Sequence, residues 1–284
     1  MNHAVYLIRC QDRKGLLATI TGFFFDRDLN VLHCQQYTDK FDGGYFMRIK
    51  IDLTGMNMTR KQLEKEFAEL AASLELNYQC FMDNDIRNVA IMVSKTSHCL
   101  YDLLVQHQEG VLPCNIPFIV SNHPDLETVA DKFRIPYYCF PVKPGKKAEQ
   151  EAAILELFAR HHIDLVVMAR YMQVLSEDFI NAYPSRIINI HHAFLPAFQG
   201  ANPYQRAWER GVKMIGATAH FATCDLDEGP IIEQDVERIS HEDDPDDMKQ
   251  LGKEIERRVL TRAVKAYLEN RIINYGRRTV VFSN

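Results

Sequence analysis

The segment "RIINIHH" (Arg186–His192) decides how the larger part of this chain folds. An apolar run leads into two adjacent histidines, which predicts a buried strand that enters a loop at its carboxyl end. Side chains two places apart in a strand lie on the same side, so Asn189 and His191 should point together and His192 elsewhere. Because a tetrahedral metal site needs convergent ligands, this divergence argues against a metal ion shared by the two histidines.

Similar short apolar strands recur on both sides of this segment and alternate with helical patterns. The clearest helix is expected within "AEQEAAILELFARHH" (148–162). The expected strands are Asn88–Ser94, Ile116–Ser121, Tyr137–Phe140, Leu165–Ala169, Arg186–Ile190 and Lys213–Ala222. Apolar strands separated by helices predict a Rossmann-like, mostly parallel sheet covered on both faces. Such a sheet binds its ligands at the carboxyl ends of its strands.

The end of the chain changes character. "MIGATAHFAT" (214–223) and "GPIIEQDVERI" (229–239) favour antiparallel pairing, and Asp244 followed by Pro245 predicts the start of a helix. "RRTVVF" (277–282) is expected to form a last strand.

Residues 1–83 carry a separate pattern of strand, helix, strand, strand, helix and strand. Asp42–Gly43 is a hairpin signal, and Thr59 is the expected N-cap of the second helix. The order predicts a ferredoxin-like βαββαβ sheet with both helices on one face. Through "DRKGLLATITGFF" (12–24) this segment resembles the ACT domain family, which implies a regulatory module that binds an amino-acid effector or serves assembly alone. A generic ferredoxin-like domain is the alternative. The rest of the chain, residues 84–284, is the expected catalytic domain.

Composition excludes several classes of protein. The 284 residues are 46% apolar and 25% charged, which is typical of a globular chain able to bury a core. The net charge of −5 predicts neither a nucleic-acid nor a membrane partner. The amino-terminal segment lacks the apolar core of a signal peptide. Seven cysteines without a Cys-x-x-Cys pair indicate reduced thiols and a cytoplasmic location.

The segment "TAHFATCDLDEGPII" (218–232) supplies the other half of a candidate site. It places His220 on a second strand and Asp227 in a loop, so we expect both to converge with Asn189 and His191. Amide and imidazole groups can stabilise an oxyanion, and a carboxylate can accept or pass on a proton. The chain has no Gly-x-Ser-x-Gly motif, which favours direct attack on a bound carbonyl. By residue type alone, a structural role at the strand ends is the alternative.

The segments "IINIHHAFLPAFQGANPYQRAWERG" (187–211), "GATAHF" (216–221) and "DLDEGPIIEQ" (225–234) resemble the folate-dependent formyltransferase family. The likeness covers about Arg87 to Leu260. It implies catalytic Asn189, His191 and Asp227, a supporting His220, no metal, and no cofactor besides the folate substrate. It also implies that Arg170–Leu175 and the loop Thr223–Asp227 line the pterin pocket, largely through backbone groups. The substrate-binding residues expected there are Met172, Gln173, Val174, Leu175, Thr223, Cys224, Asp225 and Leu226.

One loop departs from this family. Its transformylases have a Gly-rich loop after the first strand, of the kind that cradles a phosphate. Here the sequence from Asn88 to Leu104 contains no glycine, and Lys95–His98 carry bulky side chains. A ribonucleotide acceptor is therefore not expected, and water is left as the nucleophile.

An ACT-like module before this catalytic domain is the arrangement of the family's hydrolytic branch. The expected reaction is hydrolysis of 10-formyltetrahydrofolate to formate and tetrahydrofolate, which supplies formate for purine biosynthesis and balances one-carbon folate pools. Formyl transfer to an amine acceptor is the alternative. The resemblance also implies a homo-oligomer.

Overall fold

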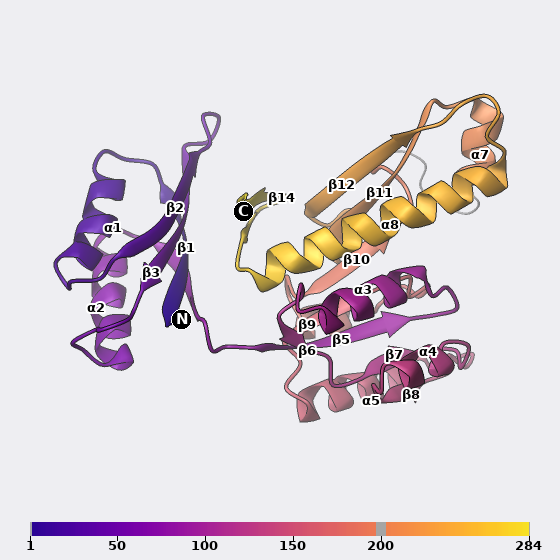
Figure 1. The fold of residues 1–284 in the computed structure, drawn as a ribbon, viewed down its shortest axis with the longest axis horizontal. Helices are drawn as coiled ribbons and strands as arrows, with labels where there is room; N and C mark the ends of the chain where they lie inside the picture. Colours follow the sequence, from indigo (N-terminus) through magenta and orange to yellow (C-terminus); the bar gives the residue numbers. More distant parts are fainter. Residues whose placement is uncertain (1, 197–202, 284) are drawn as a thin grey trace. The chain divides into compact units, whose positions relative to one another are not determined.

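The computed structural model of the chain describes residues 2–196 and 203–283, and these fall into two compact units (Figure 1). The second unit is Arg87–Leu268 with Gly276–Thr279. The first unit runs up to Ile86 and also contains Glu269–Tyr275 and the residues from Val280 on. The expected division into 1–83 and 84–284 therefore differs from the compact units at the carboxyl end of the chain. The physical reason is apolar packing, because Ile273 and Phe282 cluster with Leu7 and Phe46 of the first unit.

The first unit has the predicted ACT-like order of elements. They are β1 (His3–Gln11), α1 (Leu16–Phe25), β2 (Val31–Thr38), β3 (Gly44–Asp52), α2 (Arg60–Ser73) and β4 (Asn77–Met82). The four strands form a sheet in the order β2-β3-β1-β4, and both helices lie on one side of it (Figure 1). Tyr6, Phe24 and Phe67 are central to the buried core between the sheet and the helices. The predicted βαββαβ fold is confirmed.

Two local signals in this unit act as expected. Gly43 has a φ of 72°, a left-handed conformation that a glycine adopts without strain, and this allows the β2–β3 hairpin to turn. The Thr59 side chain accepts a hydrogen bond from the Gln62 backbone N–H, and the Gln62 side chain accepts one from the Thr59 backbone N–H. This capping box fixes the start of α2.

The second unit is built on a mostly parallel sheet. Its strands are β5 (Arg87–Val93), β6 (Cys114–Asn115), β7 (Ile119–Ser121), β8 (Tyr137–Cys139), β9 (Leu165–Met168), β10 (Ile187–His191), β11 (Met214–Phe221) and β12 (Ile231–Arg238). The main order is β12-β11-β10-β9-β5-β7-β8, and β6 pairs with β5. Strands β10, β9, β5, β7 and β8 run parallel, whereas β11 and β12 are antiparallel additions. The predicted sheet and its antiparallel end are confirmed.

Helices connect these strands and cover the sheet (Figure 1). They are α3 (His98–Gln108), α4 (Glu127–Lys132), α5 (Lys147–Arg160), α6 (Glu177–Ala182), α7 (Pro203–Arg210) and α8 (Pro245–Leu268). The Asp244 carboxylate accepts hydrogen bonds from the backbone N–H groups of Asp246 and Asp247, as its predicted capping role requires. The predicted last strand is β14 (Arg278–Val281), which pairs with β13 (Ile272–Tyr275).

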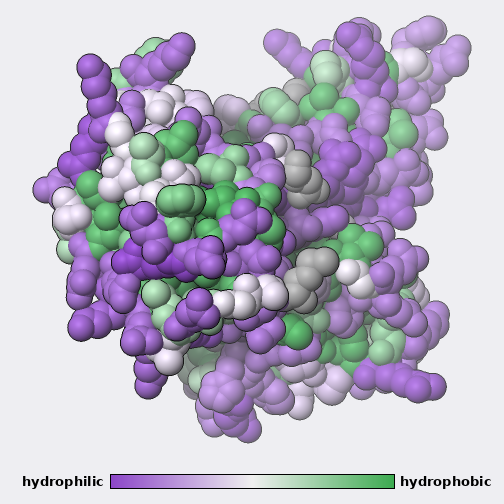
Figure 2. Space-filling view, turned by 60° about the vertical axis from the view of Figure 1, so that its left-hand side comes forward, coloured by the Kyte–Doolittle hydropathy of each residue, from purple (hydrophilic) through white to green (hydrophobic). Residues whose placement is uncertain are grey.

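The face in Figure 2 is mostly hydrophilic, and apolar residues are exposed on part of it. The large apolar residues exposed in the first unit are Leu17, Phe25, Leu32, Tyr37, Phe41, Ile86 and Val281. None of the helices within residues 2–196 and 203–283 is long and apolar enough to cross a bilayer.

Candidate active site

Strand β10 holds the first half of the site. Its apolar residues Ile187, Ile188 and Ile190 are buried in the sheet, which fixes the strand between β9 and β11. The antiparallel register places Asn189 directly opposite His220 of β11. Two motifs that lie about thirty residues apart in the chain therefore face each other across one pair of strands.

The structure brings the four predicted catalytic residues together. His191 Nδ1 lies 3.2 Å from Asp227 Oδ1, and His220 Nε2 lies 3.7 Å from the same oxygen. Asn189 Nδ2 lies 3.2 Å from His220 Nε2. A lone structural asparagine or histidine would not need these partners, so the alternative of unrelated strand-end residues does not fit this geometry.

The hydrogen bonds of His220 assign its tautomer and reveal a contact that sequence reasoning missed. His220 Nδ1 lies 2.9 Å from the carbonyl oxygen of Phe221, so Nδ1 carries the proton and donates it. The ring nitrogen Nε2 then accepts from the Asn189 amide. His220 therefore orients Asn189 in addition to lying near Asp227. This contact follows from the facing register of β10 and β11, which the sequence does not show.

The loop that carries Asp227 is tightly constrained. Asp227 itself has a φ of 57°, a left-handed conformation that is uncommon for a non-glycine residue and is often found at functional sites. A Cβ atom on Gly229 would collide with the carbonyl oxygen of Phe221, so this position accepts only glycine without a shift of the backbone. The sequence "DEGP" (227–230) thus combines the carboxylate with the residue that lets its loop close onto β11.

The Asp227 carboxyl group is ionised at neutral pH. Its pKa lies well below the ordinary value of 3.8, because the hydrogen bond with His191, and after it the neighbouring His220, stabilise the carboxylate and outweigh the effect of burial. The site therefore holds a fixed negative charge beside two imidazoles.

Two atoms of this group, His191 Nε2 and Asp227 Oδ2, are available to bind a substrate. Among the described residues, His191 Nε2 is buried and has no hydrogen-bond partner. Both imidazoles contact Asp227 through Oδ1, which leaves Oδ2 outside those two contacts. An unpartnered ring nitrogen and a carboxylate oxygen beside an amide donor can together bind a carbonyl group and a water molecule.

The backbone that follows β10 is held by buried polar groups that the sequence did not single out. The Thr218 hydroxyl donates to the carbonyl oxygen of Ala193 and accepts from the backbone N–H of Leu195. Gln234 Nε2 donates to the carbonyl oxygen of Leu195. These bonds fix the chain just after His191. Residues 197–202, which include the end of "NIHHAFLPAF" (189–198), lie outside the described part of the chain.

The predicted substrate-binding residues follow two different strands. Met172–Leu175 come after β9, and the Met172 backbone N–H donates to the Ser94 hydroxyl. Thr223–Leu226 come after β11, and the Thr223 hydroxyl donates to the carbonyl oxygen of Asp225. Met172, Val174 and Leu226 are each more than half exposed. Their role in folate binding stays a prediction.

One expectation in this region needs correction. The rings of His191 and His192 do not diverge, because their centroids lie 5.0 Å apart and the rings are stacked. Strand β10 ends at His191, so strand alternation does not extend to His192. The Arg170 Nε lies 3.5 Å from the buried Glu256 carboxylate. The expectation that Arg170–Leu175 line the pterin pocket, largely through backbone groups, stays a prediction.

Fold and site together define a formyl transferase with an amino-terminal ACT domain. The formyl transferase family model matches residues 87–264, and the ACT domain model matches residues 5–68. The chain belongs to the formyltetrahydrofolate deformylase family within this class, because relatives of that name align with it over nearly its whole length. The predicted family resemblance is confirmed.

Three comparisons illustrate the relationship. The formyltetrahydrofolate deformylase of Synechocystis sp. is 47% identical, with 99% of this chain and 98% of the relative aligned. The crystal structure of a formyltetrahydrofolate deformylase from Pseudomonas syringae pv. tomato superposes with a TM-score of 0.96 at 38% identity, covering 100% of this chain and 95% of that one. Glycinamide ribonucleotide transformylase 1 from Symbiobacterium toebii gives a TM-score of 0.66 at 29% identity, covering 72% of this chain and 97% of its own.

Proposed function

We propose that this chain hydrolyses 10-formyltetrahydrofolate to formate and tetrahydrofolate, with water as the nucleophile. The observation that carries the proposal is the ionised Asp227 carboxylate, held 3.2 Å from His191 in the same cluster as the Asn189 amide. The near full-length likeness to formyltetrahydrofolate deformylases supports the same reaction. Formyl transfer to an amine is the less favoured alternative.

The formyl oxygen is proposed to bind the Asn189 amide and the imidazolium form of His191. One N–H of the Asn189 amide donates to His220, so the second N–H is free to donate to the formyl oxygen. His191 Nε2 faces no other partner among the described residues and donates to the same oxygen when it carries a proton. Donors placed where negative charge develops stabilise the tetrahedral species that forms on attack.

Asp227 supplies the proton-transfer step. Its carboxylate orients a water molecule and takes a proton as the water oxygen bonds to the formyl carbon. The bond from that carbon to N10 then breaks, and the proton passes to N10 as the folate leaves. A carboxylate with a lowered pKa is a weak base, so the proton resides on Asp227 only briefly.

The proposal requires neither a cofactor nor a metal ion. The ring nitrogens of His191 and His220 face Asp227 Oδ1, at 3.2 and 3.7 Å. These atoms contact one another and do not point at a common position that a metal ion could occupy. Met172–Leu175 and Thr223–Leu226 are proposed to hold the pterin, and their exposed apolar side chains support this.

The wider role is also a proposal. Formate released in the cytoplasm would feed purine biosynthesis and balance the one-carbon folate pool. The ACT domain is proposed to bind an amino-acid effector, and the apolar side chains exposed on the first unit support assembly into a homo-oligomer. Light scattering of the purified protein and titration with single amino acids would test these two points.

The direct test of the reaction is dependence on an acceptor. Purified protein should release formate and tetrahydrofolate in equal amounts from 10-formyltetrahydrofolate when no amine is added. If turnover requires an added amine, the hydrolytic assignment is wrong. Activity that persists after treatment with a chelator, followed by dialysis, supports a mechanism without a metal ion.

A further inference from the structure

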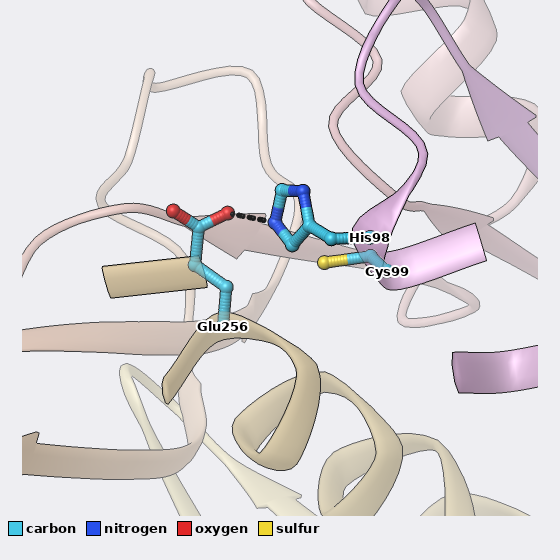
Figure 3. Close-up of side chains that lie close together, drawn as sticks. All are labelled: His98, Cys99 and Glu256. Atoms are coloured by element: carbon cyan, nitrogen blue, oxygen red, sulfur yellow. Dashed lines mark hydrogen bonds and ion pairs between the residues drawn. The ribbon is translucent and has the colours of Figure 1, made fainter. Parts of the chain in front are cut away.

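A second polar cluster lies in the same unit, outside the residues assigned to the reaction. We call it the Glu256 cluster, and it consists of Glu256 of α8, His98 at the start of α3, Arg170 after β9 and Tyr204 of α7. Glu256 Oε2 lies 2.8 Å from His98 Nε2 and 3.5 Å from Arg170 Nε. The Tyr204 hydroxyl donates to Glu256 Oε1 at 3.2 Å. Figure 3 shows the His98 ring and the Glu256 carboxylate directed at each other from α3 and α8.

The chemistry of the cluster argues against a cation site. His98, Cys99 and Glu256 offer ligand atoms within 4.8 Å of one another. However, His98 and Glu256 are hydrogen-bonded to each other, and Arg170 already brings a positive charge to the same carboxylate oxygen. Burial raises the pKa of the Cys99 thiol well above its ordinary value, which disfavours the thiolate that a metal needs. The donor set therefore does not fit a cation.

The position of the Glu256 cluster relates it to the active site. His98 follows β5 and Arg170 follows β9, so both lie at the edge of the sheet where parallel strands present their carboxyl ends, as His191 of β10 does. A continuous series of side chains joins the two groups. The His191 and His192 rings stack at 5.0 Å, the His192 and Tyr204 rings lie 6.4 Å apart, and Tyr204 reaches Glu256.

The packing of the Tyr204 ring against α8 depends on a glycine at position 252. A Cβ atom on Gly252 would collide with the Tyr204 hydroxyl, so the glycine allows the ring to lie against α8 one turn before Glu256. Glu256 is only 2% exposed, and both of its oxygens have partners. The glycine-free loop Lys95–His98 supplies His98 to the same group.

We infer that the Glu256 cluster determines the nucleophile. It fills the space beside His191–His192 that the body of an amine acceptor would need, so only water reaches the formyl carbon. The inference rests on the proposed hydrolysis. Attack by an amine would form a C–N bond in place of the C–O bond, and the proton lost by the amine would pass to N10. The chemistry is the same at Asn189 and Asp227, so exclusion by occupied space is what separates the two outcomes.

The experiment compares variants that open this space with variants that keep it filled. Tyr204→Ala removes the ring, whereas its matched control Tyr204→Phe removes only the hydroxyl. His98→Ala opens the other side, and His107→Ala is its control at the far end of α3. Each full-length protein is given 10-formyltetrahydrofolate and glycinamide, and formate, N-formylglycinamide and tetrahydrofolate are measured against a blank without enzyme.

The wild-type protein and both controls should yield formate equal to tetrahydrofolate. In Tyr204→Ala and His98→Ala N-formylglycinamide should form at a level at least about tenfold above the blank without enzyme, the scale on which a pocket discriminates by size, and formate should fall below tetrahydrofolate by the same amount. If both variants hydrolyse the substrate yet form no formylated amine at any amine concentration, the inference is overturned. If Tyr204→Ala does not fold, the products of His98→Ala alone test the inference. A wild-type protein that releases no formate would instead refute the proposed function.

Discussion

The second unit contains a half-buried carboxylate, Asp227, and a buried one, Glu256, and they differ in which neighbouring atoms lack a partner. Asp227 meets His191 and His220 through one oxygen, and the neighbouring His191 Nε2 has no partner among the described residues. Glu256 uses both oxygens on His98, Arg170 and Tyr204. The pKa of each carboxyl group is lowered. Hydrogen bonding with His191 is the largest cause for Asp227, whereas at Glu256 the His98 hydrogen bond and Arg170 outweigh an opposing burial effect.

This comparison separates a site for chemistry from a site for structure. A carboxylate with open neighbours can orient and deprotonate a water molecule, whereas a carboxylate with complete partners can only hold its surroundings in place. Substitutions at Asp227 should therefore affect turnover more than stability, and substitutions at Glu256 the reverse.

The largest expected effect is on the activity of Asp227→Asn. The amide cannot accept the proton from water, so the turnover number should fall by about 10²–10⁴, the usual contribution of general acid–base catalysis. Folate binding should persist, as measured by equilibrium titration with a non-hydrolysable analogue. Turnover close to that of the wild-type protein would show that Asp227 does not move the proton.

The stability of Glu256→Ala provides the opposite test. Removing the carboxylate leaves Arg170 buried without its ion-pair partner, which should lower the free energy of unfolding by about 3–5 kcal/mol. The exposed pair of Glu64 with Arg60 supplies the control, because Glu64→Ala should cost no more than about 1 kcal/mol. Urea unfolding of the three proteins measures the difference. Equal costs at Glu256 and Glu64 would contradict the structural role.

Asn189→Ala should reduce turnover by about 10²–10³, the typical loss for one oxyanion donor. The Michaelis constant should change much less, because the donor acts mainly in the transition state. Steady-state kinetics separates the two parameters. A variant with raised Michaelis constant and normal turnover number would assign Asn189 to substrate binding instead.

The smallest expected effect concerns His192, which lies between the two clusters. Burial, followed by the positive charge of Arg170 and by His191, lowers its pKa from 6.5 to about 4. Between these values the unfolded chain binds more protons than the folded protein at this residue, so His192 makes stability fall as the pH falls. The cost of His192→Gln should therefore shrink from neutral pH toward about pH 4.5. Unfolding at both pH values measures it, and a cost that grows on acidification would contradict this sign.

The fold was largely predictable because its signals are local. The period of the apolar residues indicated nearly every strand of the parallel sheet, and Thr59 and Asp244 marked helix starts through caps that act within one turn. The return of residues 269–275 to the first unit was not predictable, because the apolar contact of Ile273 with Leu7 joins residues far apart in sequence. The period of the apolar residues shows that a segment is buried, but it does not show which part of the molecule the segment packs against.

The candidate site was predictable to a similar extent. Asn189 and His191 lie two places apart on one strand, and this spacing is enough to place them together. The hydrogen bond from Asn189 to His220 depends on strand register, which the sequence does not show. The Glu256 cluster draws its residues from α3, α7, α8 and the loop after β9, so no short motif contains it.

The most direct test of the account is the source of the oxygen in the formate. Reaction of the purified protein with 10-formyltetrahydrofolate in water labelled with heavy oxygen, without any amine, should give formate that carries one labelled oxygen per turnover, as mass spectrometry would detect. Formate without the label, or no formate until an amine is supplied, would contradict direct attack by a water molecule oriented by Asp227.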